Sequence, residues 1–99
     1  MKLLVTAQAA SDLDEIENYI GADNPRAAVN FISQITENFG LLADNPGIGR
    51  RRDDIIPGLR SISEGNHLIF YRTRQDVVEI LRILHGARDV DELLSSDDT

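Results

Sequence analysis

Apolar residues dominate the sequence from Leu68 to Leu84, and their spacing predicts a β-hairpin. Two runs rich in Ile, Leu, Val, Phe and Tyr cover residues 68–73 and 77–84, and the short segment between them suits a hairpin loop. Strict alternation along the second run predicts one face with Val78, Ile80, Arg82 and Leu84 and another with Val77, Glu79, Leu81 and Ile83. A run that is apolar on both faces predicts a central strand. Its arginine then pairs with Glu79 or Asp89, reaches solvent, or contacts a partner.

The first half of the sequence follows a helical spacing instead. Residues 3–5 predict a short strand, and apolar residues spaced by three and four predict a helix over residues 7–20. These spaced residues are Ala9, Leu13, Ile16 and Ile20. Asn24-Pro25 then begins a second helix that extends to about residue 43. The helical spacing of Phe31 and Phe39 indicates core positions, and the short connection predicts an antiparallel helical hairpin.

The remaining segments complete an α+β fold. Glycines and prolines mark a loop over residues 45–57, a short strand follows at 59–63, and a short C-terminal helix is expected over 87–94. Residues 95–99 are expected to be frayed. The expected order is β-α-α-β-β-β in a single domain over residues 1–99, in which a small sheet of about four strands carries the helical hairpin on one face. The strand order and the direction in which the first strand pairs stay open.

Charge is distributed unevenly along the chain. The net charge is −7, but residues 50–88 hold eight arginines against five acids, which gives +3 for this segment. An acidic chain is poorly suited to general nucleic-acid binding, whereas a basic segment made only of arginine suits an acidic partner. The chain has no cysteine, its two histidines are far apart in the sequence, and we expect neither a metal nor a cofactor. No signal peptide or membrane span is predicted, so we expect a cytoplasmic protein.

Candidate chemistry gathers on the predicted sheet. Arg60, Arg72 and Arg82 fall on strands, and register decides which of them lie on the face without helices. Such an arginine-bearing face is suited to binding or catalysis. His85 is the best of the acid–base candidates, which also include Glu64, His67 and Glu79. The alternative interpretation is that His85 has only a structural role.

Several sequence segments occur here in a specific combination. They are AASDLDEIENYI, NPRAAVNFISQI, LADNPGIGR followed by GLRSI, and above all HLIFYR and VEILRILHGARD. Together they make the chain resemble the ParE branch of the ParE/RelE superfamily of bacterial toxin–antitoxin toxins, over nearly its whole length. The resemblance implies the fold expected above and a toxin held by an antitoxin encoded beside it. ParE-type toxins are associated with plasmid stabilisation and poisoning of DNA gyrase, whereas RelE-type relatives cut mRNA on the ribosome.

The branch decides the expected activity. RelE-type sites place lysines, or a glutamate and a histidine, beside the strand arginines, and often an aromatic residue near the C-terminus. Here the lysines are missing around Arg60 and Arg82, and no tyrosine follows the last strand. We therefore expect gyrase inhibition by binding, with Arg60, Arg72, Arg82 and His85 as target-binding residues. The alternatives are an mRNA endonuclease that uses Arg60, Arg82 and His85, and an inactive toxin retained as an antitoxin partner.

The resemblance also implies a ParD-like antitoxin in a hetero-oligomer, a heterotetramer or larger. Such partners carry a tail that wraps the toxin, and the basic segment suits an acidic tail. We assign this contact to Arg50, Arg51 and Arg52, together with Phe31 and Phe39 of the second predicted helix. No direct DNA binding by this chain alone and no membrane contact are expected.

Overall fold

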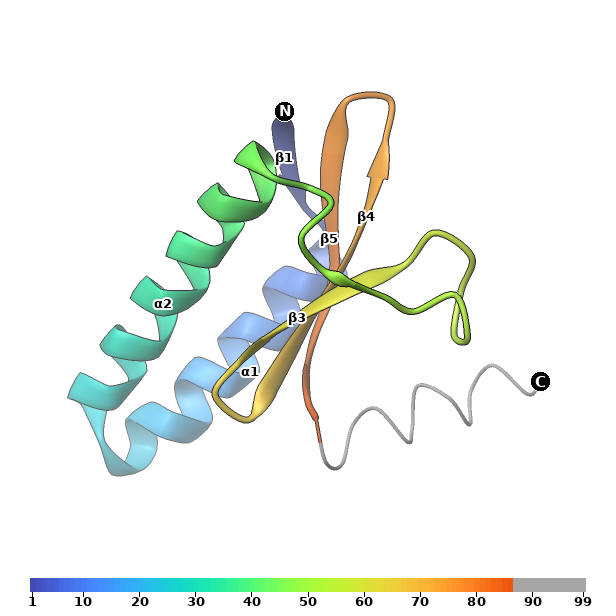
Figure 1. The fold of residues 1–99 in the computed structure, drawn as a ribbon. Coiled ribbons are helices and arrows are strands. Elements are labelled where there is room, and N and C mark those ends of the chain that lie inside the picture. The colour runs from blue at the N-terminus through green and yellow to red at the C-terminus, as the bar shows by residue number, and fades with distance from the viewer. Residues whose placement is uncertain (87–99) are drawn as a thin grey trace.

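One five-stranded sheet with two helices on one face makes up the fold, which a computed structural model describes for residues 1–86 (Figure 1). The elements in chain order are β1 (Lys2–Val5), α1 (Ala7–Asp23), α2 (Pro25–Asp44), β2 (Arg50–Arg51), β3 (Arg60–Glu64), β4 (His67–Arg74) and β5 (Val77–His85). The predicted α+β fold is confirmed. The sheet has a fifth strand because Arg50 and Arg51 pair antiparallel with β3. The predicted C-terminal helix and frayed tail lie outside the described residues.

The strand order is β1-β5-β4-β3-β2, which settles the topology that the sequence left open. β1 pairs parallel with β5, and β2, β3, β4 and β5 pair antiparallel in succession. β5 therefore lies inside the sheet, as its apolar composition predicted. Among the described residues, no strand pairs with the outer edge of β1 or of β2. Both outer strands are therefore sheet edges.

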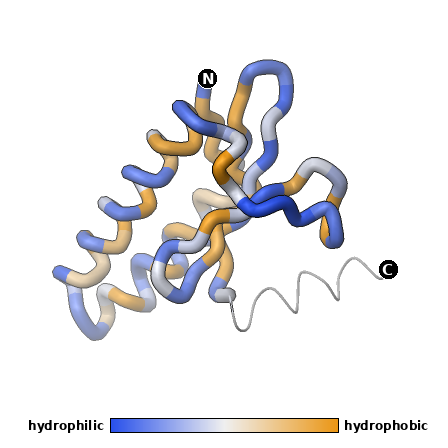
Figure 2. Tube along the Cα trace, viewed as in Figure 1, coloured by the Kyte–Doolittle hydropathy of each residue, from blue (hydrophilic) through white to orange (hydrophobic). Residues whose placement is uncertain are grey.

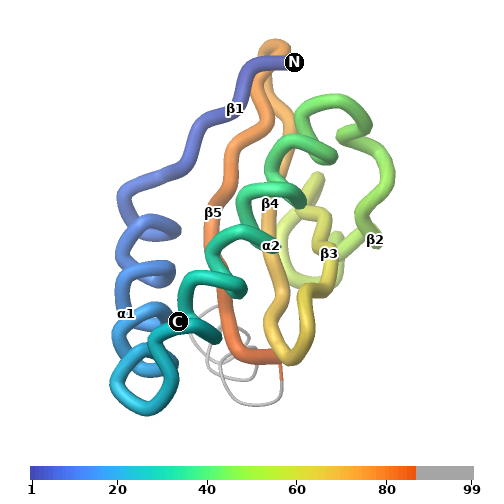
Figure 3. Tube along the Cα trace, turned by 90° about the vertical axis from the view of Figure 1, so that its left-hand side faces the viewer, coloured from blue at the N-terminus to red at the C-terminus, as the bar shows by residue number. Residues whose placement is uncertain are grey.

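The two helices form an antiparallel hairpin that covers one face of the sheet (Figure 3). Thr6 caps α1, since its Oγ1 accepts a hydrogen bond from the N–H of Ala9 at 3.2 Å. The same hydroxyl donates to the carbonyl of Ile80 at 2.8 Å and so joins the start of α1 to β5. Asn24 caps α2 through the N–H of Ala27 at 3.1 Å. These caps fix where each helix leaves the sheet.

Apolar clusters lie on both faces of the sheet. We call the face under α1 and α2 the helix face and the opposite one the second face. The helix-face cluster includes Ile35, Phe39, Ile69, Tyr71, Val78, Ile80 and Ile83. The second-face cluster holds Ile55, Leu59, Phe70 and Leu84, so the loop before β3 contributes two core residues, Ile55 and Leu59. Figure 2 shows hydrophobic residues along the sheet and a strongly hydrophilic stretch in the loop between α2 and β3.

A β-bulge shifts the alternation of side chains along β5. The pairing with β4 passes from Phe70 opposite Arg82 to Tyr71 opposite Ile80, so Leu81 has no Cα partner. Strict alternation is therefore wrong beyond Ile80, because an extra residue shifts which side chains face each side. Ile83, rather than Leu84, joins Ile80 in the helix-face cluster.

Candidate functional site

The predicted site arginines lie on different faces of the sheet. Arg60 is the Cα partner of Tyr71, which packs in the helix-face cluster, so Arg60 lies on the helix face. Arg72 is the Cα partner of Glu79 and lies one residue further along β4, so it lies on the second face. The structure therefore does not bring these two arginines together.

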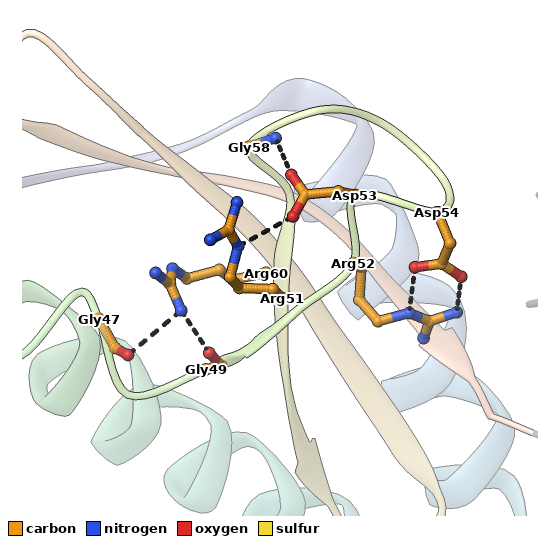
Figure 4. A network of polar contacts seen from close by, with 8 residues as sticks. All are labelled: Gly47, Gly49, Arg51, Arg52, Asp53, Asp54, Gly58 and Arg60. Carbon is orange, nitrogen blue, oxygen red and sulfur yellow. Dashed lines mark hydrogen bonds and ion pairs between the residues drawn. The ribbon is translucent and has the colours of Figure 1, made fainter.

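Arg60 anchors the loop that follows α2 (Figure 4). Its Nη1 donates hydrogen bonds to the carbonyls of Gly49 at 2.8 Å and Gly47 at 3.3 Å. The Tyr71 hydroxyl fixes the same loop, since it donates to the carbonyl of Pro46 at 2.7 Å and accepts from the N–H of Gly49 at 2.8 Å. Burial raises the pKa of Tyr71 above 10.0. A Cβ at residue 49 would collide with the Tyr71 hydroxyl, so this close approach requires glycine.

The arginine cluster of the loop is partly neutralised by its own neighbours (Figure 4). Arg51 pairs with Asp53 at 2.9 Å, and Arg52 makes two hydrogen bonds to Asp54, both of 3.1 Å. The N–H of Gly58 and the Arg51 guanidinium lower the pKa of Asp53, and the Arg52 guanidinium lowers that of Asp54.

Arg50 differs from its two neighbours. It is exposed, and its side chain makes no hydrogen bond or ion pair within residues 1–86. Of the three clustered arginines, Arg50 therefore retains the least compensated charge.

Four arginines from β2, β4 and the loop before β3 lie on the second face. Arg72 and Arg74 both approach one carboxylate oxygen of Glu79, at 3.0 and 3.8 Å. Arg50 lies opposite Ser61, whose other partner is Phe70, and the Arg52 guanidinium lies 5.9 Å from the Phe70 ring centroid. We call this set, Arg50, Arg52, Arg72 and Arg74, the arginine strip. Glu79 and Asp54 neutralise only part of this charge, so the arginine strip is positive although the protein as a whole is acidic.

Arg82 is held by an acid from α1. The Asp12 carboxylate accepts hydrogen bonds from Arg82 Nε at 2.8 Å and Nη2 at 3.1 Å, and from the N–H of Ile83 at 2.9 Å. Of the two acids predicted to pair with Arg82, Glu79 binds Arg72 instead, so that alternative is wrong, and Asp89 lies outside the described residues. Asp12 was missed as a site of interaction, although it lies three residues after Ala9 and four before Ile16, in the same apolar stripe.

His85 lies at the end of β5, opposite His67 of β4. The two ring centroids are 5.5 Å apart, and the ring of Phe31 lies 5.0 Å from that of His67. Both histidines and Arg82 also make further contacts. The four predicted target-binding residues are thus held by separate partners on separate elements.

Both histidines border a pocket that sequence reasoning did not find. It has a volume of about 590 Å³ and is lined by Glu15, Ile16, Tyr19, Ile20, Asn66, His67 and His85. The pocket lies where α1 meets the β3–β4 turn and the end of β5. Within residues 1–86, no group of three or more acidic, histidine or cysteine side chains is arranged to hold a metal ion. None of the helices in this range is long and apolar enough to cross a membrane.

Comparisons with known proteins agree on one family. The family model described as "ParE toxin of type II toxin-antitoxin system, parDE" matches residues 3–90. Toxin ParE1 of Mycobacterium tuberculosis is 34% identical over 98 residues, which cover 94% of this chain and 97% of the relative. Toxin ParE3 of Caulobacter vibrioides is 33% identical over 86 residues, which cover 86% of each chain. A solved structure titled "Chromosomal ParDE TA system from P. aeruginosa" superposes with a TM-score of 0.75 at 29% identity, over 86% of this chain and 95% of that one.

Proposed function

This chain belongs to the ParE toxin family of type II toxin–antitoxin systems, and we propose that it inhibits DNA gyrase by binding and is neutralised by a ParD-like antitoxin. Gyrase inhibition would block replication and would make loss of the antitoxin harmful to the cell. The antitoxin would bind the toxin in the cytoplasm as a hetero-oligomer.

The state of two arginines supports binding over RNA cleavage. An arginine that stabilises a phosphate during cleavage has to direct its donors at that phosphate. Arg60 instead directs its Nη1 donor at two loop carbonyls, and Arg82 makes two hydrogen bonds to Asp12. Both side chains hold the fold together, so we favour a toxin that acts through its surface.

We place the antitoxin contact on the arginine strip. Its positive charge suits an acidic segment of the antitoxin, and Arg50 contributes most because its side chain forms no ion pair within residues 1–86. Of the two aromatic residues assigned to this partner, Phe39 is 7% exposed and lies in the core. Phe31 is half-buried beside His67, so its ring is the one that a partner can reach.

We place the gyrase contact on the same strip, at Arg72 and Arg74. The Arg74 side chain is 64% exposed and lies beside the β4–β5 turn, where it projects from the sheet. An antitoxin that covers the strip would then block the target by occupying the same surface. We leave His85 and Arg82 out of this contact, because His85 lies at the end of β5 far from the β4–β5 turn and Arg82 is bonded to Asp12. Arg60 supports the strip by holding the loop before β2 in place.

The first experiment separates the two possible targets. The chain is produced in cells without its antitoxin, and DNA ends bound covalently to gyrase are measured together with mRNA ends. We expect gyrase-bound DNA breaks and intact mRNA. Cut mRNA with intact DNA would refute gyrase inhibition and would support an endonuclease. Normal growth with neither lesion, at equal soluble expression, would identify an inactive toxin.

The second experiment tests the arginine strip in the purified complex. Arg50→Ala and Arg74→Ala should each weaken antitoxin binding by up to about fivefold, as expected for exposed charges, and should reduce its dependence on salt. Arg26→Ala is the matched control, because Arg26 is an exposed arginine of α2 outside the strip. Equal affinity and equal salt dependence for all three variants would move the contact elsewhere.

A further inference from the structure

The pocket between α1 and the ends of β4 and β5 has the size of a ligand site. Its volume of about 590 Å³ falls within the range of pockets that hold a small molecule or a few side chains. It lies near the β3–β4 turn, whereas Arg74 of the arginine strip lies at the opposite end of β4. A partner that fills this pocket therefore makes a contact separate from the strip.

Five of the seven residues that line the pocket are apolar or aromatic. Ile16 and Ile20 come from one side of α1, and the rings of His67 and His85 come from the sheet. The His67 ring is held between the rings of Phe31 and His85, with centroid distances of 5.0 and 5.5 Å. These surfaces suit an aliphatic or aromatic stem better than a strongly hydrated group.

Tyr19, at the rim of the pocket, is suited to contact with another polypeptide. Tyr19 is 78% exposed, more than any other large hydrophobic residue in residues 1–86. Tyrosine is enriched at protein interfaces, because it offers a rigid ring with a polar end. An exposed tyrosine beside a concave apolar surface indicates a contact with another chain.

The charge at the pocket is negative. Glu15 is one of the lining residues, and its side chain makes no hydrogen bond or ion pair with another residue of the described range. α1 contains five acidic residues and no basic one, and only Asp12 among them is neutralised by an arginine of the described chain. An occupant with a positive charge at its tip therefore complements the site.

We propose that the pocket receives a lysine or arginine side chain from the antitoxin, with the stem along Ile16, Ile20 and the Tyr19 ring and the cationic head at Glu15. Stacking of a cation on an aromatic ring and pairing with a carboxylate act together in such a site. The antitoxin as the source of this side chain rests on the proposed function. It would then bind the toxin at two places of opposite charge, with an acidic segment on the arginine strip and a basic residue in the pocket.

The charge preference is tested on the full-length chain with a small probe. N-acetyl-arginine amide is titrated at millimolar concentration at pH 7.5, and the resonances of Tyr19, His67 and His85 are followed by NMR. The neutral isostere N-acetyl-citrulline amide is the control. We expect saturable shifts with the arginine probe and weaker binding in Glu15→Gln. Equal shifts with both probes, or no shifts at all, would overturn the pocket as a cation site.

The source of the side chain is tested in the antitoxin complex. Glu15→Gln should weaken antitoxin binding about three- to fivefold, the range expected when one partly exposed ion pair is lost. Glu17→Gln is the matched control, because Glu17 is an exposed acid of α1 that does not line the pocket. Equal affinities for the two variants would overturn the antitoxin as the occupant. A toxin that dimerises alone through Tyr19, lost in Tyr19→Ala, would identify a second copy as the occupant instead.

The two proposals fail in different ways. Failure of gyrase inhibition would appear as absent DNA breaks in cells, whatever the affinity of the Glu15→Gln variant. Failure of the pocket would appear as identical behaviour of Glu15→Gln and Glu17→Gln in a complex that still neutralises the toxin.

Discussion

Replacing Asp12 by alanine tests whether the pair between α1 and β5 fixes the helical hairpin on the sheet. The carboxylate accepts three hydrogen bonds, two from Arg82 and one from the N–H of Ile83. Removing one member of a buried ion pair costs about 3–5 kcal/mol of the free energy of unfolding. The Asp12 side chain is 8% exposed but that of Arg82 is 33% exposed, so water can partly solvate the remaining guanidinium. We therefore expect a loss of about 3 kcal/mol, at the lower end of that range.

Thermal and urea unfolding, followed by circular dichroism, measure this loss. For a domain of this size, a change of 1 kcal/mol shifts the Tm by about 4–8 °C, so Asp12→Ala should lower the Tm by about 12–24 °C. Asp12→Asn should cost less, because its remaining carbonyl oxygen can still accept the N–H of Ile83. Asp14→Ala is the control, since Asp14 is an exposed acid of the same helix and should change stability by less than about 0.5 kcal/mol.

A double-mutant cycle isolates the pair itself. If Asp12 and Arg82 interact directly, the losses of Asp12→Ala and Arg82→Ala should fail to add by at least about 1 kcal/mol. Additivity within about 0.5 kcal/mol, or a Tm for Asp12→Ala equal to that of Asp14→Ala, would refute the reasoning. The same result bears on toxicity assays. A variant at Arg82 loses stability, so its toxicity has to be compared at equal amounts of folded protein.

Three further substitutions test the loop anchor and the helix cap. Gly49→Ala should lower the free energy of unfolding by about 1–3 kcal/mol, because its Cβ collides with the Tyr71 hydroxyl. Gly47→Ala is the control, because its Cβ meets nothing within 4 Å and should not destabilise the protein. Equal urea midpoints for the two variants would contradict this prediction. The pKa of Tyr71 is raised in the folded protein, so its hydroxyl stays protonated there to a higher pH than it does in the unfolded chain. The contribution of Tyr71 to stability is therefore full below about pH 10 and is lost as the pH rises further. Urea unfolding between pH 8 and 11 should therefore show an alkaline loss that is smaller in Tyr71→Phe, and parallel pH profiles would exclude this tyrosine as the cause. Thr6→Val removes the cap of α1 and the hydrogen bond to the Ile80 carbonyl of β5, and should lower the free energy of unfolding by about 1–2 kcal/mol. An unchanged Tm would show that the cap does not stabilise the fold.

The hydrophobic pattern was sufficient to predict both helices and the strands β1, β3, β4 and β5, because each has a clear period and a clear boundary. It did not predict β2, whose two residues are both arginine. The Asn24-Pro25 pair marked the break between the helices, and the apolar composition of β5 marked an interior strand. The parallel pairing of β1 with β5 was not predictable, because it depends on how the helical hairpin returns the chain to the sheet. The bulge at Leu81 also left no signal, since the residues around it are apolar with or without a shift in register.

The candidate site was predictable only as a list of residue types. The sequence indicated that arginines would matter but not which of them would be held inside the fold. Arg60 binds loop carbonyls and Arg82 binds an acid seventy residues away, and no local pattern encodes either partner. The pocket was missed for the same reason, because its lining comes from α1, a turn and the end of a strand.

The two edges of the sheet differ in their tendency to aggregate. The β2 edge is only two residues long and both are arginine, which discourages the addition of another strand. The β1 edge carries a single charged residue, Lys2 at its start, followed by Leu3 and Leu4, which are 39% and 49% exposed. Toxin purified without a partner should therefore form oligomers through β1 as its concentration rises. A second lysine, in place of Leu4, would give this edge two charged residues, as the two arginines give β2.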